Sequence, residues 1–386
     1  MKIEKICCGC GACANVCPTH CIEMIYDDEG FIMPKINEEK CVHCDKCIGV
    51  CPLYSDSNEI EIPRVIAAYC KDDSIRYKSS SGGVFTVLAS EVLRNNGIVC
   101  GVYFDSEKQI AAHTIVENEK DLDFLRGSKY IQSETNDIYR RVEMVLREGR
   151  QILFSGTPCQ IAALRSYVGT EYDNLLCVEV ICHGVPSTLL WKKYIEFVES
   201  KSKKRIKNIL FRSKKYCWNN FGIEKEFNDA KKVFRFSFED PYFRFFNTNL
   251  CLRTSCYHCQ FKGLNTRADI SLGDFWNIDK IDRHLDDGKG LSLVLLNTDK
   301  GRKFFDSVVS SLCIVHPSID YYLACDCNHA IDRSMSESNH REEFLMDLKV
   351  DSFKFLFKKY SPLKLKYIIK GIVFRTKIGR MWGGKQ

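Results

Sequence analysis

Apolar and polar residues alternate along the chain in a pattern that predicts a body of strands and helices. Apolar runs with the length of buried strands occur at residues 65–70, 97–104, 110–116, 151–155, 175–181, 268–274 and 291–297. Segments with a broad apolar face, as expected of helices packed on a core, occur at residues 84–93, 136–148, 189–199 and 298–309. The runs at 206–212, 221–227 and 233–238 follow one another without helices and indicate antiparallel pairing. The order of elements therefore predicts a mixed α/β core.

The most specific motif is a cysteine spacing that occurs twice within the first 51 residues. The run C-x2-C-x2-C-x3-C-P is typical of two-cluster ferredoxins, in which the fourth cysteine ligates the other cluster. One predicted [4Fe–4S] cluster is held by Cys7, Cys10, Cys13 and Cys51. The other is held by Cys41, Cys44, Cys47 and Cys17. The alternative is a pair of zinc sites, which also use C-x2-C pairs, but zinc would explain neither the third C-x2 step nor the repeated Cys-Pro.

The pattern thus divides the chain into three parts. Residues 1–56 are predicted to form a small two-cluster ferredoxin-like domain, in which residues 22–33 make a hairpin with an acidic turn. A polar stretch that closes with a proline is typical of a linker, and it leads into the α/β core of residues 64–320. Residues 335–386 are predicted to form a basic helical tail. The expected fold class is α+β or α/β, with a ferredoxin-like domain, a mixed core and this tail.

Composition narrows the class of protein. The chain has 386 residues, 22 cysteines and 45% apolar residues, so it can bury a core well beyond the cysteine-rich region. The N-terminus contains no apolar signal segment, and no run of eighteen apolar residues predicts a membrane span. Because a reducing compartment preserves free thiols and clusters, we expect a cytoplasmic protein.

The net charge of +6 is concentrated in the tail. Residues 351–386 carry ten Lys or Arg and one Asp, whereas the rest of the chain carries 46 basic and 49 acidic residues. Pro362 divides this tail into two predicted amphipathic helices. They could lie at the inner membrane surface, dock on a partner, or pack on the body with solvated lysines. Nucleic-acid binding is not expected, because the basic charge is confined to the tail.

One loop of the core has the composition of a site for phosphate groups, and a second loop is basic. Residues 79–83 read SSSGG before a predicted helix, which would expose free backbone N–H groups and the positive helix dipole beside Ser81, Gly82 and Gly83. The alternative is an ordinary helix N-cap with flexible glycines, since the loop is neither a Walker motif nor G-x-G-x-x-G. The second loop, residues 125–133, is basic and contains a glycine.

Four cysteines of the core lie at positions suited to ligands. A Thr-Pro pair at 157–158 predicts a helix start, which places Cys159 in the first turn as a nucleophile, a metal ligand or an inert buried residue. Cys182 follows a predicted strand, at the end where ligands gather in open α/β sheets. The pair Cys256 and Cys259 forms a C-x2-C that fits zinc, a redox dithiol or a cluster. Together the four thiols could hold one more cubane.

The order of these motifs resembles a known family. SSSGG, RGSKY, FSGTPCQ, CHGVPS, SCYHC and DISLGDFW are similar to motifs of the family of coenzyme F420 hydrogenase/dehydrogenase beta subunits, in its bacterial branch with an N-terminal two-cluster ferredoxin domain. The resemblance covers roughly residues 1–320. It implies an α/β flavoprotein core that binds FAD and holds its own [4Fe–4S] cluster. It does not extend to coenzyme F420, because no residues here identify a pocket for that cofactor.

Carried over residue by residue, the resemblance also implies site residues. The core cluster ligands would be Cys159, Cys182, Cys256 and Cys259, with Cys251 as a substitute candidate. The FAD contacts would be Ser81, Gly82 and Gly83, followed by Ser128, Lys129 and the strand-end donor Thr157. His183 and Asp274 lie on motif segments, but neither is assigned as a catalytic acid or base. We expect His183 to act as a hydrogen-bond donor beside Cys182.

Two function hypotheses from different classes follow. In the first, the protein is an enzyme in which electrons enter through the two N-terminal clusters, pass to a core cluster and reach FAD, which reduces a small substrate. In the second, the protein is an electron-transfer subunit without a substrate of its own that serves a partner oxidoreductase. Either way, the electron source would be a redox partner protein or a small-molecule donor. A structural metal-binding protein is the third class.

Overall fold

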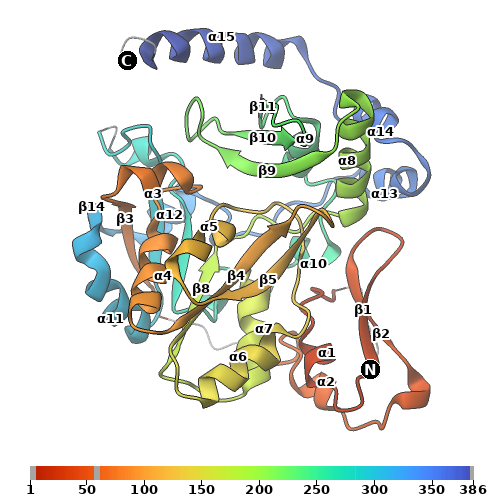
Figure 1. Cartoon of the computed structure of the whole chain (residues 1–386), viewed down its shortest axis with the longest axis vertical. Helices are drawn as coiled ribbons and strands as arrows, with labels where there is room; N and C mark the ends of the chain where they lie inside the picture. Colours follow the sequence, from red (N-terminus) through yellow and green to blue (C-terminus); the bar gives the residue numbers. More distant parts are fainter. Residues whose placement is uncertain (1–5, 56–60, 283, 383–386) are drawn as a thin grey trace.

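The computed structural model of the chain describes residues 6–55, 61–282 and 284–382. Figure 1 shows an N-terminal region of short helices and a hairpin, a central sheet covered by helices, and a small sheet flanked by the C-terminal helices. Within the described ranges, no helix combines the length and the apolarity needed to cross a bilayer.

The centre of the molecule is a nine-stranded mixed sheet with the strand order β14-β3-β13-β12-β8-β7-β4-β5-β6. The four middle strands, β12, β8, β7 and β4, are parallel to one another. On one side β13, β3 and β14 each run antiparallel to the preceding strand, and on the other side β5 runs antiparallel to β4. The strands are β3 (Arg64–Cys70), β4 (Ile98–Asp105), β5 (Ile110–Val116), β6 (Ser133–Glu134), β7 (Ile152–Gly156), β8 (Leu175–Val180), β12 (Ile270–Asp274), β13 (Ser292–Leu296) and β14 (Leu312–Ile319).

Helices cover both faces of this sheet, which explains why its strands are continuous apolar runs. Alternate residues of β7 point to opposite faces: Leu153 packs under α4 (Val84–Arg94) and α11 (Asp299–Val308). Ile152 and Phe154 pack under α6 (Ile138–Arg147) and α7 (Pro158–Val168). Shorter helices of the core are α3 (Asp73–Lys78), α5 (Leu122–Leu125), α10 (Thr254–Tyr257) and α12 (Tyr321–Cys327), with 3-10 turns at Glu119–Asp121, Gly263–Asn265, Ile278–Lys280 and Val309–Ser311.

The N-terminal region packs against α6 and α7 at one side of the core (Figure 1). It consists of α1 (Ala12–Val16), the hairpin β1 (Ile22–Tyr26) and β2 (Ile32–Ile36), a 3-10 turn at Glu38–Lys40 and α2 (Lys46–Gly49). The Cys10 carbonyl accepts hydrogen bonds from the hydroxyls of Thr135 at 3.0 Å and Tyr139 at 2.9 Å. Gly11 has φ +80°, and a Cβ there would lie 2.3 Å from the Thr135 hydroxyl oxygen, so the close approach requires glycine.

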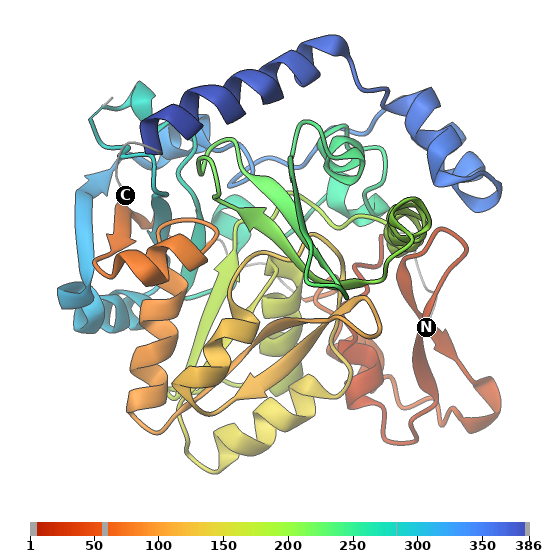
Figure 2. The same cartoon turned by 45° about the horizontal axis from the view of Figure 1, so that its top comes forward.

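A small antiparallel sheet lies above the central sheet in the view of Figure 1. Its strands are β9 (Ile206–Ser213), β10 (Gly222–Phe227) and β11 (Lys232–Phe236), in the order β11-β10-β9. Together with α8 (Thr188–Ser202), α9 (Pro241–Asn247), α13 (Arg341–Val350) and α14 (Phe353–Tyr360) it encloses an aromatic core around Trp191 and Tyr242. The last helix, α15 (Leu365–Trp382), lies across this small sheet at the edge of the molecule (Figure 2).

The structure confirms the predicted fold class. Each predicted strand and helix is present within a few residues of its expected limits, and the hairpin and the two tail helices on either side of Pro362 are present as well. The sequence pattern missed β14, whose apolar alternation is interrupted by His316 and Pro317. Proline is tolerated there because β14 is an edge strand. The proposed domain limits at residues 56, 64, 320 and 335 stay predictions.

Candidate functional site

A cavity of about 670 Å³ opens at the carboxyl ends of the parallel strands β7, β8 and β12. The loops that follow these strands line it, together with the serine-rich loop before α4 and the basic loop of residues 125–133. Ligands of open α/β sheets collect at this edge, because the loops after parallel strands converge there. Motifs that are far apart in the sequence therefore face one cavity.

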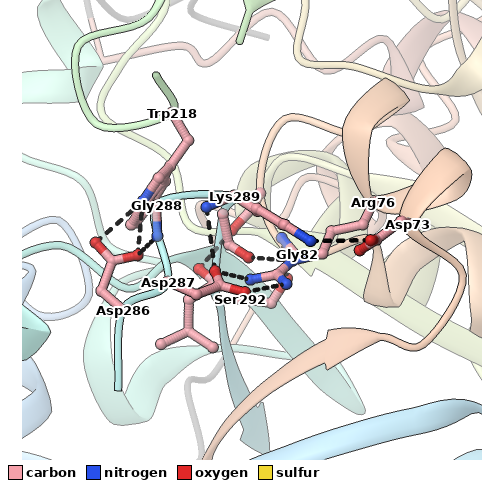
Figure 3. Close-up of polar contacts among 12 residues, drawn as sticks. Asp73, Arg76, Gly82, Trp218, Asp286, Asp287, Gly288, Lys289 and Ser292 are labelled. Carbon is pink, nitrogen blue, oxygen red and sulfur yellow. Dashed lines mark hydrogen bonds and ion pairs between the residues drawn. The ribbon is translucent and has the colours of Figure 1, made fainter. Parts of the chain in front are cut away.

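The serine-rich loop is fixed against the strand β13. The Ser81 hydroxyl donates to the Leu291 carbonyl at 2.6 Å, and the Gly82 N–H donates to the Ser292 hydroxyl at 2.9 Å (Figure 3). Ser81 and Gly83 line the cavity. Gly82 packs against β13 instead, where a Cβ would lie 2.8 Å from the Ser292 nitrogen. Gly83, at φ +90°, is the N-cap of α4, so the free N–H groups of the first turn of α4 lie beside the cavity.

Ion pairs hold a neighbouring loop, residues 286–292, beside the same wall of the cavity (Figure 3). The buried Arg76 guanidinium makes a bidentate pair with Asp287, with N–O distances of 2.7 and 2.5 Å. The Trp218 ring N–H donates to Asp286 at 2.9 Å, and the Trp218 ring stacks on Trp276 with centroids 5.1 Å apart. Trp276 lines the cavity, so this loop ties the small sheet to the serine-rich side of the site.

The basic loop meets the serine-rich loop. The Ser128 N–H donates to the Ser80 hydroxyl at 2.8 Å, and both residues line the cavity. The Lys129 ammonium points to the end of α5, where it donates to three carbonyls at 3.0–3.1 Å. Burial lowers the pKa of Lys129 to about 7. Because the ammonium donates to these three carbonyls, the Lys129 side chain fixes the basic loop to the end of α5.

Thr157 fixes the start of α7 and the position of Cys159. Thr157 and Gln160 form a capping box, in which the Thr157 N–H donates to the Gln160 side-chain oxygen at 3.0 Å. The Thr157 hydroxyl lies 3.2 Å from the Cys159 sulfur. As predicted from the Thr-Pro pair, Cys159 stands in the first turn of α7, and both Thr157 and Cys159 line the cavity.

The structure brings the four core thiols of the prediction together. Burial is the main cause that raises the pKa of Cys256 to about 12 and that of Cys259 to about 11, and the charge on the Cys159 thiol contributes to both shifts. Burial raises the pKa of Cys182 as well, and the other three thiols add to this shift. Burial also raises the pKa of Cys251 to about 12, but no thiol contributes to that shift, because Cys251 lies in the aromatic core. The arrangement therefore favours Cys256 over Cys251 in the set.

The spacing of the sulfurs discriminates between a single ion and a larger cluster. Four thiolates at about 2.3 Å from one tetrahedral zinc ion lie about 3.8 Å from one another. Within the described ranges, the single group of three Cys, His, Asp or Glu ligand atoms within 4.8 Å of one another is Glu38, Cys41 and His43. Among the described residues, no three of the core sulfurs therefore lie within 4.8 Å of one another, which is wider than the spacing around one zinc ion.

A buried arginine beside these thiols has an unpaired donor. The Arg253 guanidinium donates to the Cys7 carbonyl at 3.0 Å and to the Ile32 carbonyl at 2.8 Å, so it joins the N-terminal region to the core. Its positive charge acts on both Cys159 and Cys256. Its Nε is buried and has no hydrogen-bond partner among the residues that the structure describes. A buried, positively charged donor of this kind is suited to a negatively charged iron–sulfur cluster. The surroundings of the four core thiols therefore fit such a cluster.

One N-terminal thiol set surrounds a cavity of its own. A cavity of about 100 Å³ is lined by Cys17, Cys41, Cys44 and Cys47, which are the four predicted ligands of one cluster. Cys17 comes from the first half of the repeat and the others from the second, as the two-cluster motif predicts. Cys21 also lines this cavity, and its sulfur lies 3.4 Å from that of Cys17.

Three cysteines of the other predicted set, Cys7, Cys13 and Cys51, also lie near one another. Burial raises the pKa of Cys13 to about 12, and the Cys7 and Cys51 thiols add to this shift. Burial raises the pKa of Cys51 as well, with a contribution from Cys7. Cys51 thus joins the first-half cysteines although it stands in the second half of the motif.

Sequence reasoning did not assign a role to Cys8, which the structure places between the two regions. Cys8 is buried and lines the large cavity. The Cys10 thiol is the largest cause of the raised pKa of Cys8, and the Cys159 thiol acts on it in the opposite direction. Cys8 is therefore a link between the N-terminal thiols and the core thiols. In the sequence, its position directly after the predicted ligand Cys7 could have indicated this role.

An ion pair inside the cavity was also missed. Arg212, at the end of β9, makes a bidentate pair with Asp274, at the end of β12, with N–O distances of 2.7 and 3.0 Å. Its guanidinium lies 3.9 Å from the Phe221 ring centroid, and its Nε is buried without a partner in the described part of the chain. Nothing in the sequence around Arg212 distinguishes it from the other basic residues of the small sheet. Asp274, on a motif segment, serves as its counter-ion.

Glu179 is a buried carboxyl group on β8 at the cavity wall. It accepts hydrogen bonds from the hydroxyls of Ser271 at 2.6 Å and Thr266 at 2.7 Å. Burial raises the pKa of Glu179 to about 7, and the two hydroxyls oppose this shift.

His183 lies on the cavity beside Cys182, and its Nε2 pairs with the Asn249 side-chain oxygen at 2.8 Å. This contact occupies one ring nitrogen of His183.

The paired thiol sets and the α/β core define the class as an iron–sulfur protein with a two-cluster N-terminal region. Residues 6–54 match the family profile described as a 4Fe-4S dicluster domain. Residues 65–139 and 149–321 match the profiles of the N-terminal and C-terminal parts of the coenzyme F420 hydrogenase/dehydrogenase beta subunit. Because the two parts together cover most of the chain, it belongs to that family, as the motifs indicated.

The chain is also similar to individual known proteins. A subunit of the F(420)H(2) dehydrogenase of Methanosarcina mazei is 22% identical over 322 residues, which are 79% of this chain and 83% of that protein. An uncharacterized polyferredoxin-like protein of Methanocaldococcus jannaschii is 48% identical over 66 residues, so the chain spans 39% of its length. A chain of the F420-reducing [NiFe] hydrogenase complex from Methanosarcina barkeri superposes over 72% of this chain and 90% of its own, with a TM-score of 0.47 and 17% identity.

Proposed function

We propose that the protein is an iron–sulfur electron-transfer subunit that serves a partner oxidoreductase. The observation that carries the proposal is the continuity of the thiols. Cys8 lies between Cys10 of the N-terminal region and Cys159 of the core, and Cys159 borders the large cavity. A partner protein is supported by the relatives, since the matching profiles describe a beta subunit and the Methanosarcina mazei protein is named a subunit. The 22 free cysteines are compatible with the reducing cytoplasm.

The finer assignment of cofactors is part of this proposal. Cys159, Cys182, Cys256 and Cys259 would hold a third [4Fe–4S] cluster, with the Arg253 charge beside it. When bound, the clusters would supply one-electron transfer, and FAD would exchange between one- and two-electron steps. The protein's part is to hold these groups, to exclude water and to set the local charge.

FAD would lie in the large cavity. A volume of about 670 Å³ is within the range of about 300–1,000 Å³ that ligand sites occupy. Ser80, Ser81 and the first turn of α4 would receive the diphosphate, because they offer hydroxyls and free N–H groups at a helix N-terminus. Arg212, whose guanidinium pairs with Asp274, also lines this cavity. Ser128 and Thr157 line the same cavity, whereas Gly82 supports the loop from behind.

A second candidate is the flavin-dependent enzyme that reduces a small substrate. The observation that favours it is the size of the cavity together with its aromatic lining, which includes Phe221, Phe243 and Trp276. Such a lining could hold a small molecule against a flavin. Coenzyme F420 is not part of either proposal.

The decisive experiment determines the cofactor content of the chain. The protein is purified without oxygen, its iron, sulfide and flavin are quantified, and it is titrated with dithionite. The proposal expects about twelve iron atoms, for three clusters of four, and one flavin. Cys256→Ser should remove about four iron atoms, whereas the matched control Cys217→Ser, outside the thiol sets, should remove none.

Other outcomes would decide against parts of the proposal. Eight iron atoms in both variants would refute the third cluster, and full iron without flavin would refute the FAD site. Zinc in place of iron would refute electron transfer altogether. The reduced protein is then mixed with small-molecule acceptors and with candidate partner oxidoreductases. Turnover with a small molecule alone favours the enzyme, and oxidation by the partner alone favours the subunit.

A further inference from the structure

The last helix carries apolar residues on two opposite faces. In a helix with 3.6 residues per turn, Tyr367, Gly371 and Phe374 share one face. This face packs on the small sheet: the Phe374 and Phe236 ring centroids are 5.8 Å apart, and those of Tyr367 and Phe238 are 6.3 Å apart. α15 is thus attached to the body through one side.

An ion pair fixes the rotation of α15 about its axis. The Arg375 guanidinium makes a bidentate pair with the nearly buried Glu239, with an N–O distance of 2.5 Å. Gly371 lies against the same carboxylate, and a larger side chain there would clash with it. The face of the helix that points away from the body is therefore determined.

The outward face is apolar, although it lies at the edge of the molecule (Figure 2). Its members are aliphatic, occur at the spacing of one helix face and are between 40% and 69% exposed: Leu365, Ile368, Ile369, Ile372 and Val373. An aliphatic row of this kind leaves apolar area in water, which favours a covering partner.

Charge identifies the occupant of this face. The segment from Ser352 to Gln386 contains ten Lys or Arg and no Asp or Glu. Lys364 and Lys366 are exposed beside the aliphatic row. A helix that combines an aliphatic face with flanking lysines is suited to the interface of a bilayer with anionic headgroups, where the aliphatic side chains enter the acyl boundary and the lysines meet the phosphates. A protein partner would need an acidic groove of matching length.

We propose that α15 is a peripheral membrane anchor that lays its aliphatic face, Leu365, Ile368, Ile369, Ile372 and Val373, into an anionic lipid surface. The helix needs no large rearrangement for this, because its other face is already packed on the body. The inference is independent of the proposed electron transfer. It would place the small sheet next to the membrane.

The test is co-sedimentation of the full chain with vesicles. The lipid is phosphatidylcholine alone or phosphatidylcholine mixed with phosphatidylglycerol, each at low and high salt. We expect binding to the anionic vesicles, weaker binding at high salt, and little binding to neutral vesicles. Equal binding to both lipids, or no binding to either, would overturn the proposal.

Variants distinguish vesicle binding through the aliphatic face of α15 from non-specific adsorption of the protein. Ile368→Ser with Ile372→Ser should weaken vesicle binding by at least about tenfold. The matched control is Val350→Ser, an exposed aliphatic residue at the end of α13, which should leave binding unchanged. Lys366→Glu should weaken binding to anionic vesicles, whereas Lys349→Glu on α13 should not. Iron content and far-UV circular dichroism confirm that each variant is folded.

Two further results would contradict a lipid occupant. If the Ile368→Ser, Ile372→Ser variant changes the sedimentation coefficient of the protein in the absence of vesicles, the face is an interface between copies of this chain. If the variant binds vesicles as the unsubstituted protein does, another part of the surface carries the binding.

Discussion

The buried Arg253 guanidinium should control how firmly the N-terminal region is attached to the core. It donates to the Cys7 carbonyl at 3.0 Å, to the Ile32 carbonyl at 2.8 Å and to the Gln132 side-chain oxygen at 2.8 Å. Two of these acceptors belong to the N-terminal region and one to the core. The side chain is 3% exposed, so water does not compete for the contacts.

The magnitude follows from the number of contacts. A hydrogen bond from a charged donor contributes about 1.5–3 kcal/mol, and an unpaired buried acceptor costs about 1–3 kcal/mol. Removing the guanidinium also removes the cost of burying a charge, which offsets part of this loss. We therefore expect Arg253→Ala to destabilise the native state by about 4 kcal/mol. Arg253→Lys keeps the charge but loses the planar fork, so about half of that loss is expected.

The assay is the rate at which the clusters lose their absorbance in a fixed concentration of guanidinium chloride under anaerobic conditions. Cluster loss is irreversible, so a rate is the appropriate measure of stability. If the contacts are already broken in the transition state, about 4 kcal/mol corresponds to an acceleration of roughly 10²–10³-fold. The control is Arg147→Ala, whose side chain is 70% exposed and pairs with Glu143 on the same helix. It should change the rate less than about threefold.

The reasoning would be refuted if Arg253→Ala lost its clusters no faster than the Arg147→Ala control. A rate for Arg253→Lys equal to that of the unsubstituted protein would show that charge alone, and not the three-acceptor geometry, holds the N-terminal region.

Three other predictions concern the core thiols, a buried carboxyl group and a glycine. Cys182→Ser should lower the iron content of the purified protein by about four atoms, whereas Cys251→Ser should not change it; the reverse result would make Cys251 the ligand. The pKa of Glu179 is raised from 4.5 to about 7, so the folded state holds this proton more tightly than the unfolded state, and the stability from it is lost as pH rises from about 5 to 7. Glu179→Gln should remove this pH-dependent loss of stability, which amounts to about 3 kcal/mol at about 1.36 kcal/mol per pH unit. The test compares the unfolding rates of the unsubstituted protein and the variant at pH 5 and pH 8. An unchanged pH dependence in the variant would contradict the prediction. Gly11→Ala should speed cluster loss at least about tenfold, because its φ is +80° and its Cβ would meet Thr135; an unchanged rate would show that the loop can relax.

The local pattern of the sequence determined most of the elements. β7 and β8 are continuous apolar runs, because both faces of the central sheet are covered by helices, and such runs are visible without a structure. The Thr-Pro pair placed the start of α7, and the repeated cysteine spacing grouped Cys17 with Cys41, Cys44 and Cys47, which line one cavity. These features depend on neighbouring residues, on periodicity or on fixed ligand spacings. The sequence pattern did not predict β14, because an edge strand tolerates a proline that interrupts its apolar alternation.

Tertiary structure decided which residues meet. Cys8 links two thiol sets because the N-terminal region packs beside α7, and Arg253 joins the same two regions from a third segment of the chain. Arg212 and Asp274 pair across the cavity although 62 residues separate them. Gly82 faces a strand, whereas its neighbours face the cavity. Such contacts depend on how distant segments pack, and no local periodicity encodes that packing. The repeated cysteine spacing of residues 7–51, by contrast, is local and is visible in the sequence alone.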